Sequence, residues 1–215
     1  ITEAVIATPS PNPLAVGLGM NGHHGITVRR SVYDRWLQER ARARGATVLG
    51  RQTITDIDFS PDAVAVRVRE DGSEIRFRAP LLVHAGGFNC QPIDRRLGIR
   101  WPAPRDLGVT YQVWWALPED AIAERFGSAV RFFFDERLLP QGYLWAFPKH
   151  DFVAVGLGTT LEVVRSRRLN LRRLLTHFME TNPDLRDRLR GGRVTKTDGG
   201  CIPLAIQPRL QLGSC

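Results

Sequence analysis

The chain has few cysteines, almost no lysine and no long apolar run. Its three cysteines (Cys90, Cys201 and Cys215) are an odd number without metal-ligand spacing, which fits a reducing compartment and gives no sign of a disulfide framework. No stretch approaches the ~18 consecutive apolar residues of a membrane-spanning helix. Lys149 and Lys196 are the only lysines, so arginine carries nearly all of the net charge of +8.

The composition is that of a folded globular chain. A hydrophobic fraction of 43% and a charged fraction of 24% are ordinary for a domain with a core, and 215 residues suffice for one or two domains. The arginines are spread over predicted helices and loops, and no nucleic-acid-binding module is recognisable, so we expect no nucleic-acid partner. Attraction of these arginines to anionic membrane headgroups is a milder possibility.

The most informative stretch is Pro140–Pro148, with the sequence PQGYLWAFP, followed closely by VAVGLG at 153–158. Tyr143, Trp145 and Phe147 alternate along it, so on an extended strand all three rings project from one face. Such a face suits a pocket for a long apolar or planar ligand. From periodicity alone, a core between a sheet and a helix is the better interpretation, because aromatic residues are common in strands.

The remaining patterns predict a mixed α+β chain. Apolar periodicity indicates a helix at 31–44, closed by Gly45, and a second helix around Leu171–Phe178 that ends near Asn182-Pro183. The expected strands are 47–59, 63–69, 74–78, 81–84, 108–117, 129–136, 142–148, 152–158 and 193–203, with a hairpin turn at 70–73 and an antiparallel meander between 108 and 158.

Four segments, in order along the chain, resemble motifs of the FAD-dependent geranylgeranyl reductase family, part of the superfamily of flavoproteins similar to p-hydroxybenzoate hydroxylase. The strongest is P-x-x-Y-x-W-x-F-P at Pro140–Pro148, which resembles the substrate-pocket signature of that family. The others are RSVYDRWL at 30–37, LVHAGGFNC at 82–90 followed by RRLGI at 95–99, and GGCIP at 199–203.

The resemblance implies part of an α/β FAD-binding domain plus an antiparallel-sheet substrate domain. We expect the FAD-binding part at residues 1–99, the substrate-binding domain at 100–203, and the return to the FAD domain at 204–215. The family's N-terminal G-x-G-x-x-G and later G-D motif are not found, so the chain reads as an internal portion of a longer flavoprotein. Gly17–Gly22 satisfies G-x-G-x-x-G literally, but three β-branched residues and a glycine follow it, so a turn between short strands is the better interpretation.

The resemblance also assigns residues to a site, with FAD as the cofactor. Arg30 would lie near the flavin pyrophosphate, or else would simply face solvent. The turn Ala85-Gly86-Gly87 would approach the flavin, although Gly86 stands where the family has aspartate. The substrate-binding residues would be Pro140, Tyr143, Trp145, Phe147 and Pro148. No catalytic residue is assigned, and Tyr143 as a proton donor is disfavoured by the ordinary pKa of a phenol, near 10.

The implied activity is reduction of C=C bonds in a geranylgeranyl or other isoprenoid chain of a lipid substrate. The electron donor, NAD(P)H or a ferredoxin-like protein, is left open. We expect a cytoplasmic protein with peripheral membrane contact as an option, no metal site, and His84 as a satisfied core residue. Two alternatives remain: a related FAD-dependent monooxygenase or halogenase, and a non-catalytic lipid- or partner-binding remnant. The segment alone is expected to bind FAD weakly and to be inactive.

Overall fold

The computed structural model describes residues 1–10, 12–19, 25–87, 94, 97–99 and 101–205. The chain divides into two compact units, which are described separately. Unit 1 consists of Ile1–Arg29 and Pro102–Ala205, and the described part of unit 2 lies within Arg30–Trp101.

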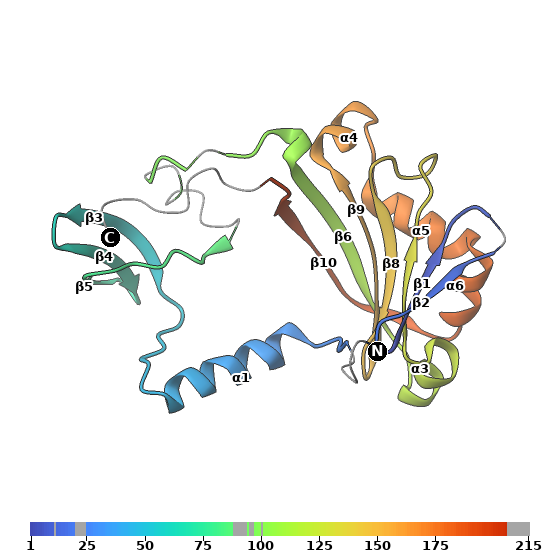
Figure 1. The fold of residues 1–215 in the computed structure, drawn as a ribbon, viewed down its shortest axis with the longest axis horizontal. Coiled ribbons are helices and arrows are strands. Elements are labelled where there is room, and N and C mark those ends of the chain that lie inside the picture. The colour runs from blue at the N-terminus through green and yellow to red at the C-terminus, as the bar shows by residue number, and fades with distance from the viewer. Residues whose placement is uncertain (11, 20–24, 88–93, 95–96, 100, 206–215) are drawn as a thin grey trace. The chain divides into compact units, whose positions relative to one another are not determined.

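Unit 1 is built on a seven-stranded sheet with the order β10-β6-β9-β8-β7-β1-β2 (Figure 1). Strands β6 to β10 pair antiparallel with one another, and β7, β8 and β9 follow one another as a meander. At the other end β1 pairs parallel with β7 and antiparallel with β2. The strand bounds are β1 Glu3–Ala7, β2 Leu14–Gly17, β6 Leu107–Ala116, β7 Ala129–Phe133, β8 Tyr143–Pro148, β9 Phe152–Thr160 and β10 Arg193–Pro203.

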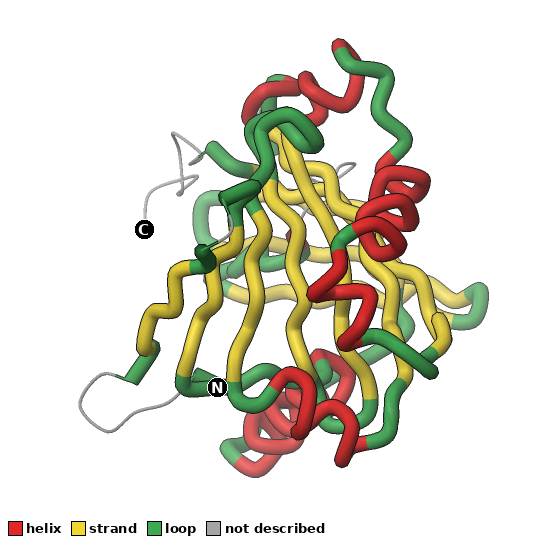
Figure 2. The backbone as a smooth tube through the Cα atoms, turned by 90° about the vertical axis from the view of Figure 1, so that its right-hand side faces the viewer, coloured by secondary structure: helices red, strands yellow, loops and turns green. Residues whose placement is uncertain are grey.

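Helices pack against one face of this sheet, which we call the core face (Figure 2). They are α3 (Glu119–Phe126), α5 (Leu171–Thr181) and α6 (Pro183–Arg188). A shorter helix, α4 (Leu161–Ser166), contacts β6, β9 and a 3-10 turn, η2, at Pro104–Asp106. Alternate residues of β8 and β9 point to them and are almost fully buried: Leu144, Ala146, Val153, Val155 and Leu157. Since each buried aliphatic side chain of Val or Leu size contributes about 1.5–3 kcal/mol, this layer is the main source of stability.

The helices begin at residues that cap them. The Asn170 Oδ1 accepts the backbone N–H of Arg173 at 3.0 Å, and the Asn182 Oδ1 accepts that of Leu185 at 2.9 Å. Pro183 occupies the first turn of α6, where its fixed φ is helical and its missing N–H costs nothing. The sequence Asn182-Pro183 therefore ends one helix and begins the next.

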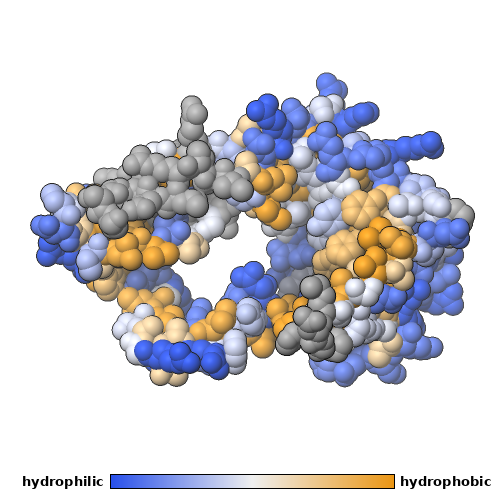
Figure 3. All heavy atoms as spheres, viewed as in Figure 1, coloured by the Kyte–Doolittle hydropathy of each residue, from blue (hydrophilic) through white to orange (hydrophobic). Residues whose placement is uncertain are grey.

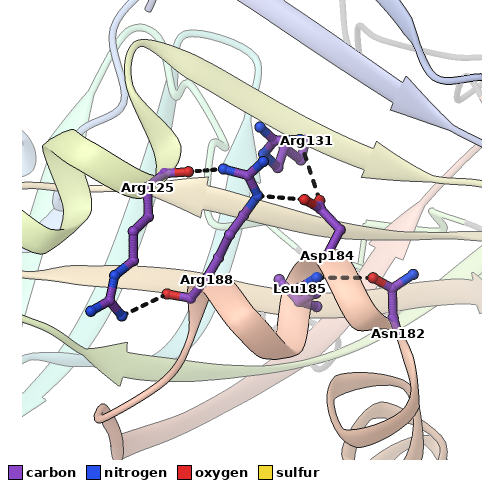
Figure 4. A network of polar contacts seen from close by, with 6 residues as sticks. All are labelled: Arg125, Arg131, Asn182, Asp184, Leu185 and Arg188. Carbon is purple, nitrogen blue, oxygen red and sulfur yellow. Dashed lines mark hydrogen bonds and ion pairs between the residues drawn. The ribbon is translucent and has the colours of Figure 1, made fainter.

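An arginine network ties α6 to α3 and β7 (Figure 4). Asp184 accepts from Arg188 Nε at 2.7 Å and lies 3.4 Å from Arg131 Nη1. Arg188 also donates to the backbone carbonyl of Arg125, and Arg125 donates to the carbonyls of residues 188 and 190. Burial, reinforced by the nearby Arg188 charge, lowers the pKa of Arg131, so Asp184 is the counter-charge that its position requires.

Unit 2 contains α1 (Arg30–Ala43) and a three-stranded antiparallel sheet of β3 (Thr53–Ser60), β4 (Ala63–Glu70) and β5 (Ser73–Ala79). The turn between β4 and β5 has positive φ at both central residues, 47° at Asp71 and 85° at Gly72, as a two-residue hairpin requires. After α1 the chain turns at Gly45, whose φ of 91° suits a residue without a Cβ.

The predicted α+β class is confirmed, as are the helix at 31–44 and the antiparallel pairing of the strands between 108 and 158. Two local predictions were wrong. The strand expected from 47 begins at Thr53, and Leu81–His84 is not a strand. Leu81 and Val83 are 61% and 77% exposed, and no described strand pairs with them, so the apolar run lacked the partner that a buried strand needs.

The N-terminal residues also differ from the predicted division at residue 99. Residues 1–29 form part of unit 1, because β1 hydrogen-bonds to β7 and β2 to β1. The reason is non-local: Ala4 and Val5 are buried in the same sheet as residues more than 120 positions away. Part of the Gly17–Gly22 loop lies outside the described residues.

Candidate functional site: an aromatic face of the sheet

The three predicted rings lie together on the face of the sheet opposite the helices. Ring centroids are 5.7 Å apart for Tyr143 and Trp145, and 6.1 Å apart for Trp145 and Phe147. Phe132 on β7 reaches both ends of the row, at 5.8 Å from Tyr143 and 5.2 Å from Phe147. Phe134, 5.6 Å from Tyr143, extends the group by one ring. We call this side of the sheet the aromatic face.

The neighbouring strand β9 supplies small residues opposite each ring. The antiparallel register pairs Tyr143 with Gly158, Trp145 with Gly156 and Phe147 with Ala154. This explains the sequence VAVGLG: its large residues point to the core face, and its small ones leave room on the aromatic face. The stretch was noted in the sequence, but its role follows only from the register.

The indole of Trp145 lies directly over the two glycines. A Cβ at Gly156 would be 2.4 Å from Trp145 Cζ2 and 2.6 Å from Gln112 Cβ. A Cβ at Gly158 would be 2.9 Å from Thr110 Cγ2 and 3.6 Å from Trp145 Cζ3. Real side chains do not approach so closely, so glycine at 156 is what allows the ring to lie where it does.

Thr27 and Arg29 contact residues that follow Phe147 in the chain. The Thr27 Oγ1 donates to the Pro148 carbonyl at 2.6 Å, and the Arg29 Nη2 donates to both carboxylate oxygens of Asp151 at 2.7 and 2.6 Å. The Arg29 guanidinium also lies 5.7 Å from the ring centre of Trp114 and 5.3 Å from that of Phe152.

Trp114 and Phe152 stack on each other, with centroids 4.3 Å apart and planes 5° apart. The Lys196 Nζ lies 4.4 Å from the Trp114 centroid, so this indole contacts two cations. Neither Trp114 nor Arg29 was among the predicted site residues. In the sequence, alternation along β6 places Trp114 on the same side as Gln112 and Thr110. Only the strand order, with β9 between β6 and β8, shows that this is the side of the aromatic row.

Lys149 follows the row and is half-buried. Burial lowers the pKa of its ammonium group from the ordinary value of 10.5. Its backbone N–H bonds the carbonyl of Phe152 at 2.8 Å, and its side chain has no hydrogen-bond or ion-pair partner among the described residues. A half-buried cation thus lies at the hairpin where the aromatic row ends.

The two prolines of the signature bound the strand rather than extend the row. Pro148 pairs with Val153 and is buried on the core face, while its carbonyl receives Thr27. The carbonyl of Pro140 accepts the Thr159 Oγ1 at 2.6 Å. The rings themselves are accessible in part: Tyr143 is 39% exposed and Phe147 is half-buried, whereas Trp145 is 9% exposed.

The aromatic face takes no part in the cavity of about 570 Å³ that described residues of unit 1 line. Val113, Trp115 and Leu175 line that cavity from the core face, and none of the three rings contributes to it.

The residues predicted to contact FAD lie in unit 2. Arg30, at the first turn of α1, is exposed and donates to Asp34 Oδ1 at 3.0 Å; this bond raises the pKa of the guanidinium. Ala85, Gly86 and Gly87 are exposed, and Gly87 has a φ of 63°, the left-handed region that favours glycine. His84 lies in the segment after β5, just before Ala85. Its Nε2 is 2.7 Å from Asp94 Oδ1.

The comparisons with known proteins agree with the motifs. Residues 114–198 match the family model described as the geranylgeranyl reductase catalytic domain. The chain is 24% identical, over 196 residues, to the digeranylgeranylglycerophospholipid reductase of Methanocaldococcus jannaschii; the alignment covers 91% of this chain and 48% of that protein. The chain spans about half the length of the curated relatives it matches. The predicted resemblance to the geranylgeranyl reductase family is confirmed.

Solved structures show the same fold. A geranylgeranyl bacteriochlorophyll reductase-like protein from Thermoplasma acidophilum superposes with a TM-score of 0.79 at 20% identity, over 99% of this chain and 52% of that one. CmlS, a flavin-dependent halogenase, superposes with a TM-score of 0.67 at 21% identity. The superposition covers 94% of this chain and 37% of CmlS. At these sequence identities the structural similarity establishes the fold alone, and the chemistry has to be argued from the residues of the site.

Proposed function

Residues 114–198 match the geranylgeranyl reductase catalytic domain, and on that premise we propose that this chain supplies the substrate wall of a flavin-dependent reductase acting on the C=C bonds of an isoprenoid chain. The observation that carries the proposal is the aromatic row Tyr143, Trp145 and Phe147, held on one face of the sheet with Phe132 beside it on the neighbouring strand.

The row suits an unconjugated trisubstituted alkene. Such a bond accepts hydride poorly, so partial protonation toward a tertiary cation accompanies the transfer in our proposal. Ring faces attract such positive charge by about 0.5–2 kcal/mol for each well-placed ring. The three rings, spaced at 5.7 and 6.1 Å, would orient the chain, exclude water from it and modestly stabilise the developing charge.

FAD, the proposed cofactor, would supply the hydride when bound and once reduced by the electron donor. Some of the predicted residues of unit 2 are suited to contact FAD. Arg30 presents an exposed guanidinium, and Gly87 adopts a backbone conformation with φ of 63°. Gly86 offers no carboxylate, so Arg30 and the backbone of the turn are the groups that would hold FAD. The electron donor, NAD(P)H or a ferredoxin-like protein, stays a prediction.

The shared fold keeps a flavin-dependent halogenase or monooxygenase as the second enzyme class, as the likeness to CmlS illustrates. The aromatic row and the family-model match favour the reductase. A non-catalytic lipid-binding role would use the same wall without turnover.

The test is a pair of measurements on the chain and on Trp145→Leu. We expect geranylgeraniol to change the tryptophan fluorescence of the chain, and Trp145→Leu to bind it at least tenfold more weakly. With FAD in excess and reduced by dithionite, mass spectrometry of the isoprenoid identifies reduction as the gain of two hydrogen atoms. Because this segment alone is expected to be inactive, binding without reduction fits both the reductase and the non-catalytic role. Absence of geranylgeraniol binding would contradict the proposal, and binding of phenolic substrates in preference to the isoprenoid would favour the halogenase class.

A further inference from the structure

Part of the positive charge of the chain lies on the helices of unit 1. Residues 161–193 hold nine arginines and four acidic residues, an excess of five positive charges in a chain whose net charge is +8. We call this segment, α4 to α6 and the turn after them, the basic layer. Eight of its arginines are exposed: Arg165, Arg167, Arg168, Arg172, Arg173, Arg186, Arg190 and Arg193. In Figure 3 the outline of the molecule where Figure 1 places α4, α5 and α6 is largely hydrophilic.

Few of these charges are neutralised within the layer. Asp187 lies 3.2 Å from Arg186 Nε and 3.6 Å from Arg190 Nη2, so one carboxylate serves two guanidiniums. Asp184 is taken by the buried network of Arg188 and Arg131. The other six exposed arginines form no ion pair or side-chain hydrogen bond within the described part of the chain. An uncompensated excess of exposed charge of one sign attracts a surface of the opposite sign.

An apolar cavity opens beside these arginines. Its volume is about 570 Å³, within the range of sites that hold small molecules or parts of them. Its inner wall is apolar, and its edge carries Arg186, Asp187 and Arg190 from the α6 side and Thr176 and Glu180 from α5. The apolar residues of the wall are Val113, Trp115, Leu175, Met179, Leu189 and Val194.

The cavity is a built feature of the fold. The Trp115 Nε1 donates to the Leu189 carbonyl at 2.9 Å, which fixes the ring that forms one wall. A Cβ at Gly192 would lie 2.1 Å from that nitrogen, so the turn after α6 depends on glycine to admit the indole. Val194, from the edge strand β10, remains 46% exposed at the mouth.

From the charge and the cavity together we infer that the basic layer docks on an anionic phospholipid bilayer, with one acyl chain entering the cavity. Arginines at the edge face the headgroup phosphates, while the apolar wall receives the chain. A nucleic acid would use the arginines but not the apolar wall. The layer also has no exposed aromatic residue for base stacking, since Phe178, the one aromatic residue of 161–193, is buried. The described residues contain no helix long and apolar enough to cross a membrane.

The test is sedimentation of the chain with vesicles of phosphatidylglycerol or of phosphatidylcholine. We expect binding to the anionic vesicles alone, weakening as salt is raised, because surface charges are screened over about 10 Å at 0.1 M. The variant Arg172→Gln/Arg186→Gln/Arg190→Gln removes three charges, and each charge near an anionic surface changes the affinity about fivefold. It should therefore bind on the order of 100-fold more weakly.

The matched control removes the same charge from unit 2, with Arg69→Gln/Arg76→Gln/Arg78→Gln in the exposed positions of β4 and β5. The control should bind as the unchanged chain does. Equal losses in both variants, or no binding to anionic vesicles at low salt, would overturn the inference. A nucleic acid would replace the bilayer in the inference under two conditions together. The chain would bind polyuridylate and not vesicles, and the first variant would lose about 100-fold in affinity for polyuridylate.

The acyl chain is tested separately by Val194→Asp, which puts a charge at the cavity mouth. Its control, Thr195→Asp, places the same charge on the exposed neighbouring residue outside the cavity. We expect Val194→Asp to bind vesicles at least tenfold more weakly than Thr195→Asp does. Equal effects would remove the acyl chain from the inference. Trp145→Leu should bind vesicles normally, so failure of the proposed reductase function would not affect this result.

Discussion

Replacing Gly156 with alanine should displace the ring at the centre of the aromatic face. The new methyl group would lie 2.4 Å from Trp145 Cζ2 and 2.6 Å from Gln112 Cβ, on the two neighbouring strands. The indole must move, and because Gln112 Cβ moves only with its backbone, the pairing of β6 with β9 must shift as well. Overpacking of this kind costs about 1–3 kcal/mol.

A smaller gain opposes that cost. Alanine restricts the unfolded chain more than glycine does, which favours folding by roughly 0.5–1 kcal/mol where the backbone conformation allows it. We therefore expect Gly156→Ala to lower the free energy of unfolding by about 1–2 kcal/mol. For a chain of this size that corresponds to a fall in Tm of roughly 2–8 °C.

The assay combines urea denaturation with near-ultraviolet circular dichroism, which reports the environment of the tryptophans. Gly200→Ala in β10 is the matched control, because a Cβ there meets nothing within 4 Å. It should leave both the stability and the spectrum nearly unchanged.

A double-mutant cycle with Trp145→Leu identifies the partner. If the clash with the indole is the cause, Gly156→Ala should cost at least 0.5 kcal/mol less in the Trp145→Leu background, since contacting residues are non-additive by about 0.5–3 kcal/mol. A Gly156→Ala protein with unchanged stability and spectrum would refute the packing argument.

Three further predictions follow from the contacts described above. Asp184→Asn should lower the free energy of unfolding by about 1–3 kcal/mol in urea melts, because Arg131 and Arg188 lose their carboxylate; a loss below 0.5 kcal/mol would show that the network is dispensable. Burial lowers the Lys149 pKa, so the folded state binds fewer protons than the unfolded state between that lowered pKa and 10.5, and stability should rise with pH across that window. Lys149→Met should be at least as stable as the unchanged chain at neutral pH and should lose that rise, and an identical pH profile would contradict the assignment. FAD added to the purified chain should leave on dialysis, and stoichiometric flavin absorbing near ~450 nm afterwards would disprove weak binding.

The sequence predicted best what depends on local pattern. Alternation of Tyr143, Trp145 and Phe147 was enough to place three rings on one side of a strand, and the Asn182-Pro183 pair marked a helix boundary correctly. These features are set by the two-residue repeat of a strand and by capping chemistry, both of which are readable over a few residues.

What the sequence could not predict depends on which strands lie side by side. Trp114 joins the aromatic face because β6 pairs with β9, and the roles of Gly156 and Gly158 follow from their register with β8. The same limit explains residues 1–29, whose strand β1 pairs with a strand more than 120 residues later. The Leu81–His84 run shows the converse, since an apolar stretch becomes a strand only where a partner is available.

The central claim is that the aromatic face contacts an isoprenoid chain. Photo-cross-linking with a geranylgeranyl analogue that carries a diazirine on its chain, followed by peptide mapping, tests it most directly. We predict labels on Tyr143, Trp145 and Phe147, which geranylgeraniol suppresses by competition. Labels confined to Trp115 and Met179 in the cavity of the core face, with none on the row, would contradict the claim.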